Sequence, residues 1–330
     1  MSITARIDKV TEITPEYFAP VVPAPRSVKI ELTPRCQYRC VFCALRTRED
    51  QPTSESDMDI EFFKRITTEM REAGVEEIGC FYLGEPFMAP NLLVQAIAWC
   101  KQVLKFPYVF VTTNGALATP RWVEACMVAG LDSLKFSINA ADFEQFEKVM
   151  GVRSKNYIKA LEHLRLAREV RDRGGYKCGI YASSIRFDGE QQEKLDALLK
   201  EYVLPFVDEH YLLPLYSMAM NSGEITKKLG YVPMHGNSGR FDPKTGQPTR
   251  TGLPCWALFT EGHVRSDGHL SACCFGSDDK FDVGDLNTQT FLEAWNGPGM
   301  QKVRAAHIKA KTEGPGALKG TFCEVCVAYS

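Results

Sequence analysis

The sequence lacks the features that mark membrane and secreted proteins. No apolar run approaches the roughly 20 residues that cross a bilayer, and the first residues, Met-Ser-Ile-Thr-Ala-Arg-Ile-Asp, hold no apolar signal core. The net charge is only −2, so no strongly charged surface for nucleic acid or an anionic membrane is expected. We therefore expect a cytoplasmic protein that binds neither nucleic acid nor a membrane.

Signs of a disulfide-bonded secreted fold are also missing, although the chain has 12 cysteines. Its 330 residues, 45% of them hydrophobic, are enough for one large domain and a small one. A core of that size needs no covalent cross-links. We therefore expect the cysteines to bind a metal or an iron–sulfur cluster in a reducing compartment.

Strand and helix patterns alternate along most of the chain. Strands are expected at 27–32, 77–82, 108–112, 133–138, 176–185 and 209–215. Helices are expected at 60–73, 91–103, 120–129, 156–173 and 189–202. Successive βα units predict an α/β fold, in which helices cover a parallel sheet.

Three cysteines follow the first expected strand. Cys36, Cys40 and Cys43 are separated by three and then two residues. Soft thiolate ligands this close together suit an iron–sulfur cluster. A 4Fe–4S cluster takes four ligands, so three cysteines leave one iron for a ligand that is not protein. Structural zinc, which usually takes four protein ligands, and three unrelated thiols are the alternatives.

A second cysteine set lies in the C-terminal part. Cys255 and Cys273 flank a hairpin pattern whose turn is expected at 266–268, and Cys323 and Cys326 form a Cys-x2-Cys pair. Together they supply four ligands for one site. This spacing permits zinc and a cluster equally.

The first cysteine set, with Phe42 before its last member, resembles the motif of the radical S-adenosylmethionine (SAM) superfamily. The resemblance implies a partial (β/α)6 barrel with its chemistry at the carboxyl ends of the strands. It also implies that the open iron binds SAM and that an electron from a flavodoxin- or ferredoxin-type donor cleaves SAM. The resulting 5′-deoxyadenosyl radical then abstracts a hydrogen atom from the substrate.

Further positions match that family's SAM-binding motifs. Gly84-Glu85 resembles its Gly-Gly-Glu motif, with Leu83 in place of the first glycine; a turn with a helix-capping acid is the alternative. Asn139 replaces a frequent aspartate, and Arg153 is equally compatible with a solvated surface side chain. The resemblance implies these SAM-binding residues: Phe42, Gly84, Glu85, Thr113, Asn114, Ser137, Asn139 and Arg153.

The second cysteine set resembles the SPASM/twitch extension of radical SAM enzymes. Segments 283–286 and 291–296 resemble the region after that module's hairpin. Because the chain stops four residues after Cys326, the shorter twitch form is expected. The resemblance implies one auxiliary 4Fe–4S cluster held by Cys255, Cys273, Cys323 and Cys326.

These patterns predict four segments. They are an extended, proline-rich lead-in at 1–26, the barrel at 27–216, a Gly/Pro-rich connection at 217–254 and the SPASM/twitch domain at 255–330. The lead-in leaves no room for the peptide-binding domain of many peptide-modifying relatives, which favours a small-molecule substrate.

The remaining polar and thiol groups are interpreted as follows. Four cysteines fit strand or helix patterns and are expected in the core: Cys80, Cys100, Cys126 and Cys178. Cys274 is a candidate hydrogen-atom donor. Candidate catalytic bases are Lys177, Tyr181 and His210; buried structural hydrogen bonds are the alternative, and a lone histidine such as His210 is more often structural than catalytic.

An oxidoreductase is the leading hypothesis for the function. Resemblance to the twitch-bearing 2-deoxy-scyllo-inosamine dehydrogenase implies oxidation of an alcohol carbon, with the auxiliary cluster as electron acceptor. The substrate is then a sugar, an aminocyclitol or a nucleoside-like compound of natural-product biosynthesis. Alternatives are an epimerase that uses Cys274, a decarboxylase, a peptide-modifying enzyme, and a non-enzymatic electron-transfer or zinc protein.

Overall fold

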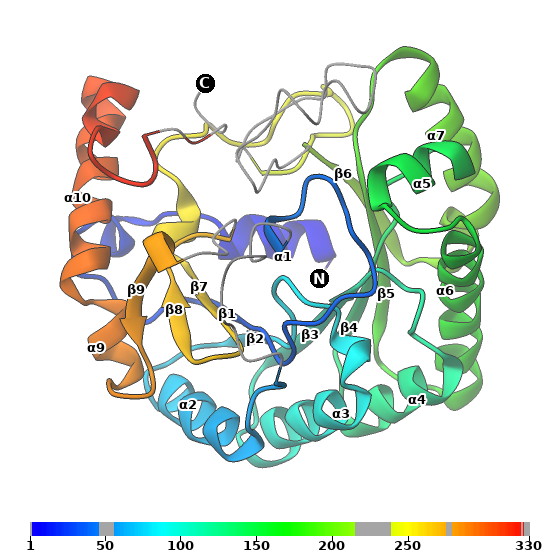
Figure 1. The fold of residues 1–330 in the computed structure, drawn as a ribbon, viewed down its shortest axis with the longest axis horizontal. Coiled ribbons are helices and arrows are strands. Elements are labelled where there is room, and N and C mark those ends of the chain that lie inside the picture. Colours follow the sequence, from blue (N-terminus) through cyan, green and yellow to red (C-terminus); the bar gives the residue numbers. More distant parts are fainter. Residues whose placement is uncertain (1, 46–55, 215–238, 275–278, 325, 327–330) are drawn as a thin grey trace.

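One curved sheet organises the molecule, for which a computed structural model describes residues 2–45, 56–214, 239–274, 279–324 and 326 (Figure 1). Within these residues the strand order is β6-β5-β4-β3-β2-β1-β7-β8-β9. The parallel strands of the barrel are β1 (Ser27–Ile30), β2 (Glu77–Gly79), β3 (Tyr108–Thr113), β4 (Ser133–Ser137), β5 (Gly179–Ile185) and β6 (Glu209–Leu213). The predicted partial (β/α)6 barrel is confirmed.

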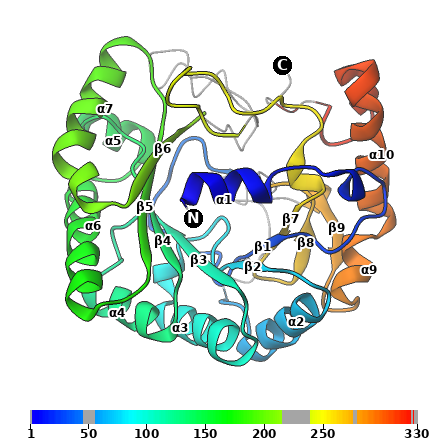
Figure 2. The ribbon, with the colours of Figure 1, turned by 180° about the vertical axis from the view of Figure 1, so that it is seen from behind.

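Helices cover the outer side of this sheet (Figure 2). They are α2 (Ile60–Glu72), α3 (Pro90–Ala98), α4 (Pro120–Ala129), α6 (Lys155–Gly174) and α7 (Gly189–Tyr202), whereas α5 (Phe143–Met150) lies toward the carboxyl ends of the strands. The strands bury alternate apolar residues against them; Val28, Ile30, Leu134 and Phe136 have no exposed surface. The cysteines expected in the core are also buried there. The residues between these apolar positions face the interior of the barrel.

Helix α5 was not predicted. The Asp142 carboxylate accepts a hydrogen bond from the backbone N–H of Gln145 at the start of α5, and Gly151 ends the helix in the left-handed region at φ 63°. With eight residues it is too short to give a strong periodic pattern.

The C-terminal hairpin is confirmed, but it does not form a separate layer. It consists of β7 (Glu261–Val264) and β8 (His269–Ser271), followed by β9 (Asp282–Asp285), α9 (Phe291–Trp295) and α10 (Pro298–Glu313). Strand β7 pairs in parallel with β1, so the barrel sheet continues into the C-terminal part. This pairing brings residues from the far end of the chain against the first barrel strand.

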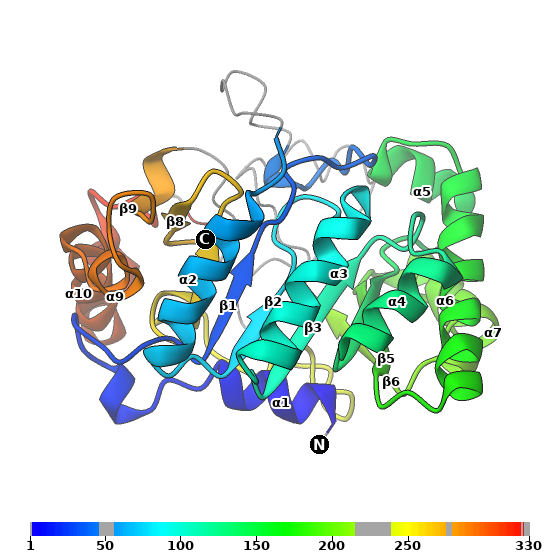
Figure 3. The same cartoon turned by 90° about the horizontal axis from the view of Figure 1, so that it is seen from below.

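The N-terminal segment requires a correction, because it contains the helix α1 (Ile3–Val10) and is not extended throughout. Its prolines begin only at Pro15, and Ser2 caps the helix. Arg6 pairs with Glu77 and lies 3.0 Å from the centroid of the Tyr108 ring. Figure 3 shows α1 below the strands, at the end where they begin.

The boundaries of the four expected segments stay predictions. The Gly/Pro-rich connection falls in large part on residues 215–238, which lie outside the described residues. Within the described ranges, every helix is too short or too polar to cross a bilayer.

Candidate active site

The loop with the first three cysteines is anchored by α5. The backbone N–H groups of Arg39 and Val41 donate to the carbonyls of Met150 and Val149, each at 2.9 Å. Gly151 permits this close approach, because a Cβ there would lie 2.7 Å from the Arg39 carbonyl oxygen. The unpredicted helix therefore holds the cysteine loop at the carboxyl end of the strands.

The thiols of this loop fit thiolate ligands of a cluster. Burial, together with the charge of the nearby Glu85 carboxylate, raises the pKa of Cys36 to about 12. Cys43 is close enough to contribute to the same effect. Iron binds the thiolate form, so a bound cluster keeps the cysteine deprotonated despite the raised pKa of the free thiol. The site thus offers thiols that a cationic cluster would hold ionised.

Gly84 and Glu85 join three loops at this end of the barrel. The N–H of Gly84 donates to Glu31 Oε1 at 3.1 Å, and a Cβ on Gly84 would overlap the carbonyl oxygen of Thr33. The N–H of Glu85 donates to the carbonyl of Arg35 at 2.9 Å. Only a glycine fits so close to the backbone of the cysteine loop.

The Glu85 carboxylate accepts three hydrogen bonds from protein groups. They come from Thr113 Oγ1 at 2.7 Å, Asn114 N at 2.8 Å and Phe87 N at 3.1 Å. Burial nevertheless raises its pKa to about 7. Glu85 therefore ties the end of β3 to the loop after β2. Its expected contact with the SAM ammonium stays a prediction.

The other expected SAM contacts lie around this rim. Asn114 Nδ2 is 3.8 Å from the sulfur of Cys36, and Ser137 ends β4. Asn139 is half-buried two residues later, and Phe42 packs against the core. Arg153 is exposed in the turn before α6. The structure thus places all these positions except Arg153 in partly or fully buried surroundings.

Three of the four auxiliary cysteines lie near one another. Burial raises the pKa of Cys323 above its usual value, and the neighbouring thiols of Cys255 and Cys326 raise it further. Cys273 lies beyond β8, where its carbonyl accepts a hydrogen bond of 2.7 Å from Tyr82. Across the described residues, no three ligating side chains lie close enough to hold a single metal ion. The thiols are therefore arranged more widely than in a mononuclear site.

The barrel interior contains a buried ionic cluster that the sequence analysis missed. Glu261 Oε1 lies 2.6 Å from Lys29 Nζ and 2.8 Å from His263 Nε2. Although burial opposes it, the charge of Lys29 and the bond from His263 hold the pKa of Glu261 at about 2. The available signal was a pair of charged residues that alternate with glycine and valine in an otherwise buried strand.

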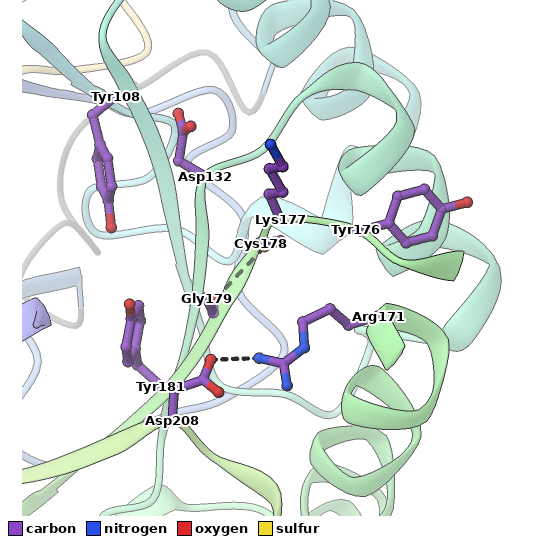
Figure 4. A pocket seen from close by; sticks show the side chains of 9 residues that line it. All are labelled: Tyr108, Asp132, Arg171, Tyr176, Lys177, Cys178, Gly179, Tyr181 and Asp208. Atoms are coloured by element: carbon purple, nitrogen blue, oxygen red, sulfur yellow. Dashed lines mark hydrogen bonds and ion pairs between the residues drawn. The ribbon is translucent and has the colours of Figure 1, made fainter. Parts of the chain in front are cut away.

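The three candidate catalytic bases lie away from the cysteine end, and their catalytic role stays a prediction. Lys177 and Tyr181 line a depression beside Asp208 at the start of β5 and β6 (Figure 4). These strands are parallel to β1, so their starts lie opposite the cysteine loop. His210 bonds Ser184 at 3.0 Å and lines a second depression with residues of α7. Its side chain therefore points out toward the helix layer.

Two family models match the chain. One describes the radical SAM superfamily and matches residues 30–200, more than half of the chain. The other describes an iron–sulfur cluster-binding domain, SPASM, and matches residues 255–326. The cysteine sets described above lie one in each matched region, and their thiols, most of them half-buried, fit the 4Fe–4S clusters that these domains imply as cofactors together with SAM.

Curated relatives match only part of their own length. A GTP 3′,8-cyclase of Chlorobaculum tepidum is 30% identical over 138 residues, which are 42% of this chain and 40% of that protein. A PqqA peptide cyclase of Methylorubrum populi is 31% identical over 137 residues, which are 41% of this chain and 34% of that protein. The chain thus spans about two fifths or less of these relatives.

Solved structures match most of the chain. One is SuiB of Streptococcus suis, bound to the precursor peptide SuiA. The alignment includes 90% of this chain and 68% of the SuiB chain, with 19% sequence identity and a TM-score of 0.58. Another is BtrN, in complex with AdoMet and 2-DOIA. The alignment includes 91% of this chain and 92% of the BtrN chain, with 14% sequence identity and a TM-score of 0.56. At these identities the likeness concerns the fold. The chain belongs to the radical SAM superfamily and carries an iron–sulfur cluster-binding SPASM domain.

Proposed function

We propose that this enzyme oxidises an alcohol carbon of a small polar metabolite, such as a sugar, an aminocyclitol or a nucleoside-like compound. The observation that carries the proposal is the buried Glu261–His263 pair. It lies on β7, in the same hairpin that connects the auxiliary cysteines Cys255 and Cys273. A base and an electron acceptor on one hairpin are what alcohol oxidation requires.

His263 is suited to act as that base. The ionised Glu261 carboxylate can only accept a hydrogen bond, so Nε2 of His263 carries the proton and donates it. Nδ1 then carries the lone pair, and it has no hydrogen-bond partner among the described residues. Burial lowers the pKa of His263, which keeps the ring neutral. Glu261 in turn orients the ring and stabilises the cation that forms when the ring takes a proton.

The reaction balances as a two-electron oxidation. When bound, the cofactors supply a 5′-deoxyadenosyl radical that takes the carbon-bound hydrogen atom, and an oxidised auxiliary cluster that takes one electron. His263 accepts the hydroxyl proton, which makes loss of that electron favourable and leaves a C=O group. Tyr82, whose ring centroid lies 5.3 Å from that of His263 and whose hydroxyl binds the Cys273 carbonyl, keeps base and auxiliary site adjacent.

The relatives are compatible with more than one outcome. BtrN, a 2-deoxy-scyllo-inosamine dehydrogenase, supports oxidation of a small molecule. The PqqA peptide cyclase and the SuiB–SuiA complex represent peptide substrates. Epimerisation is the second candidate, favoured by Cys274, whose thiol is close enough to Lys29 and Glu261 for their charges to act on its pKa.

We expect His263→Gln to lower product formation by about 100-fold, because general-base catalysis contributes on this scale. Iron content and SAM binding should stay unchanged, because His263 belongs to neither cysteine set. The measurement is anaerobic turnover of a screened panel of polyols and aminocyclitols, with ketone and 5′-deoxyadenosine quantified. The matched control is His210→Gln, whose side chain points toward α7 and which should retain wild-type turnover.

Turnover in D2O, followed by measurement of deuterium in the product, distinguishes the two candidate reactions. Oxidation in D2O yields a ketone in a one-to-one ratio to 5′-deoxyadenosine, whereas epimerisation returns a hydrogen and incorporates deuterium at the reacting carbon. A deuterated, unoxidised product that disappears in Cys274→Ala would replace oxidation by epimerisation. Full activity of His263→Gln would remove His263 from the mechanism.

A further inference from the structure

Lys135 is an interior lysine without a counter-charge. It is the third residue of β4, and its backbone pairs in register with Thr112 and Tyr181. Its ammonium lies 5.7 Å from the centroid of the Tyr211 ring, which comes from β6, the second strand along the sheet from β4. The side chain is thus directed into the interior and not toward the helix layer.

Two lysines share this interior, but only one is neutralised. Lys29 has Glu261 as its partner at 2.6 Å. Lys135 forms no ion pair with a described residue. Burial and the charge of Lys29 lower the pKa of Lys135 to about 8, and Glu261 compensates only in part. Among these interior groups, Lys135 is therefore the cation that lacks an ion-pair partner.

The carboxylates on neighbouring elements are engaged elsewhere. Glu31, on the strand segment that follows Lys29, accepts hydrogen bonds from Gly84 and Ser266. Glu209, at the start of β6, accepts a hydrogen bond of 2.9 Å from the backbone of Ile3 in α1. Contact with the Tyr211 ring stabilises an ammonium by about 1 kcal/mol but does not neutralise its charge. A half-buried ammonium without an ion-pair partner favours an anionic ligand.

We propose that Lys135, supported by Lys29, binds an anionic group of the substrate, a carboxylate or a phosphate or sulfate ester on a small polar molecule. This inference rests on the proposed function, because it places the substrate in the interior next to His263. The anion occupies mid-height of the barrel, since both lysines are third residues of their strands. The rest of the substrate then extends toward the cysteine end, where the adenosyl radical forms.

The test uses thermal unfolding of the reconstituted holoenzyme, saturated with SAM so that the SAM site is filled, with sulfate as the probe. Sulfate is expected to raise the Tm of the wild type, because a ligand that binds the folded state stabilises it. Lys135→Met should weaken sulfate binding about tenfold or more. Lys135→Arg should retain the effect, since Arg keeps the charge.

The matched control is Lys159→Met, which removes an exposed lysine on α6 and should leave the sulfate effect unchanged. If Lys135→Met does not fold, Lys135→Gln replaces it.

The pH dependence of the sulfate effect gives a further readout. Lys135 is charged below a pKa of about 8 and loses its charge above it, so the sulfate effect should fade as the pH rises through 8.

Either of two results would overturn the proposal: no sulfate effect in the wild type, or an unchanged effect in the neutral Lys135 variants. Production of 5′-deoxyadenosine by the same samples is measured in parallel. Because Lys135 touches neither cysteine set, a failed sulfate result with intact SAM cleavage contradicts the anion site and leaves the proposed function standing. Lost SAM cleavage in the wild type would contradict the proposed function instead.

Discussion

Replacing Cys36, Cys40 and Cys43 together with alanine is expected to lower the iron content from about eight to about four per chain and to abolish SAM cleavage. The three thiols come from one loop that α5 holds in place, so the triple variant removes every cysteine of that loop motif at once. The measurement is iron counting after anaerobic reconstitution, together with assay of 5′-deoxyadenosine. The loss of activity should be complete, since SAM is expected to bind the iron that no cysteine ligates.

The reciprocal variant is the matched control. Replacing Cys255, Cys273, Cys323 and Cys326 with alanine should also remove about four irons, but it should leave SAM cleavage measurable. Formation of the ketone should be lost, because the electron acceptor is missing. A wild-type protein with about four irons and one zinc would show that the second set is a zinc site, and the proposal of oxidation would then fall.

Gly84→Ala is expected to have the second largest effect. A Cβ at this position overlaps the carbonyl oxygen of Thr33 and lies 3.1 Å from that of Arg35, so the cysteine loop has to move. Backbone atoms cannot yield as a flexible side chain does. We expect the free energy of unfolding to fall by about 2 kcal/mol or more. The free energy of SAM binding should fall by at least the same amount.

The comparison for Gly84→Ala is Gly316→Ala, where a Cβ meets no atom within 4 Å. That variant should have the stability and SAM affinity of the wild type. Chemical unfolding and equilibrium binding of SAM provide the two readouts. Unchanged SAM binding in Gly84→Ala would contradict the tight packing of Gly84 against the cysteine loop and its assignment to the SAM site.

Sequence periodicity located the barrel elements well where they are long. The predicted helices at 120–129 and 189–202 have the bounds of α4 and α7 in the structure. Periodicity failed at α1 and α5, which have eight residues each. A helix of two turns shows few repeats of its apolar face, and its stability comes from caps and from tertiary contacts.

The cluster ligands could be predicted because their chemistry is local. Cysteines separated by two or three residues lie close together in almost any loop conformation. The proposed base, His263, and its ionic partners could not be predicted in this way. Lys29 and Glu261 are 232 residues apart, and they meet only because β7 pairs with β1. Tyr181 and His210 lie on barrel strands and Lys177 lies just before β5, but strand register decides their height in the barrel and the face that they occupy.

By itself the sequence determined the superfamily, the alternation of strands and helices, and the two cysteine sets, since each depends on residues that are near one another along the chain. Only the tertiary structure decided which charged side chains share the barrel interior. That choice depends on the curvature of the sheet, which brings Lys135 of β4 toward Lys29 of β1 and Tyr211 of β6. It also depends on desolvation, because a charge acts strongly on its neighbours only where water is excluded.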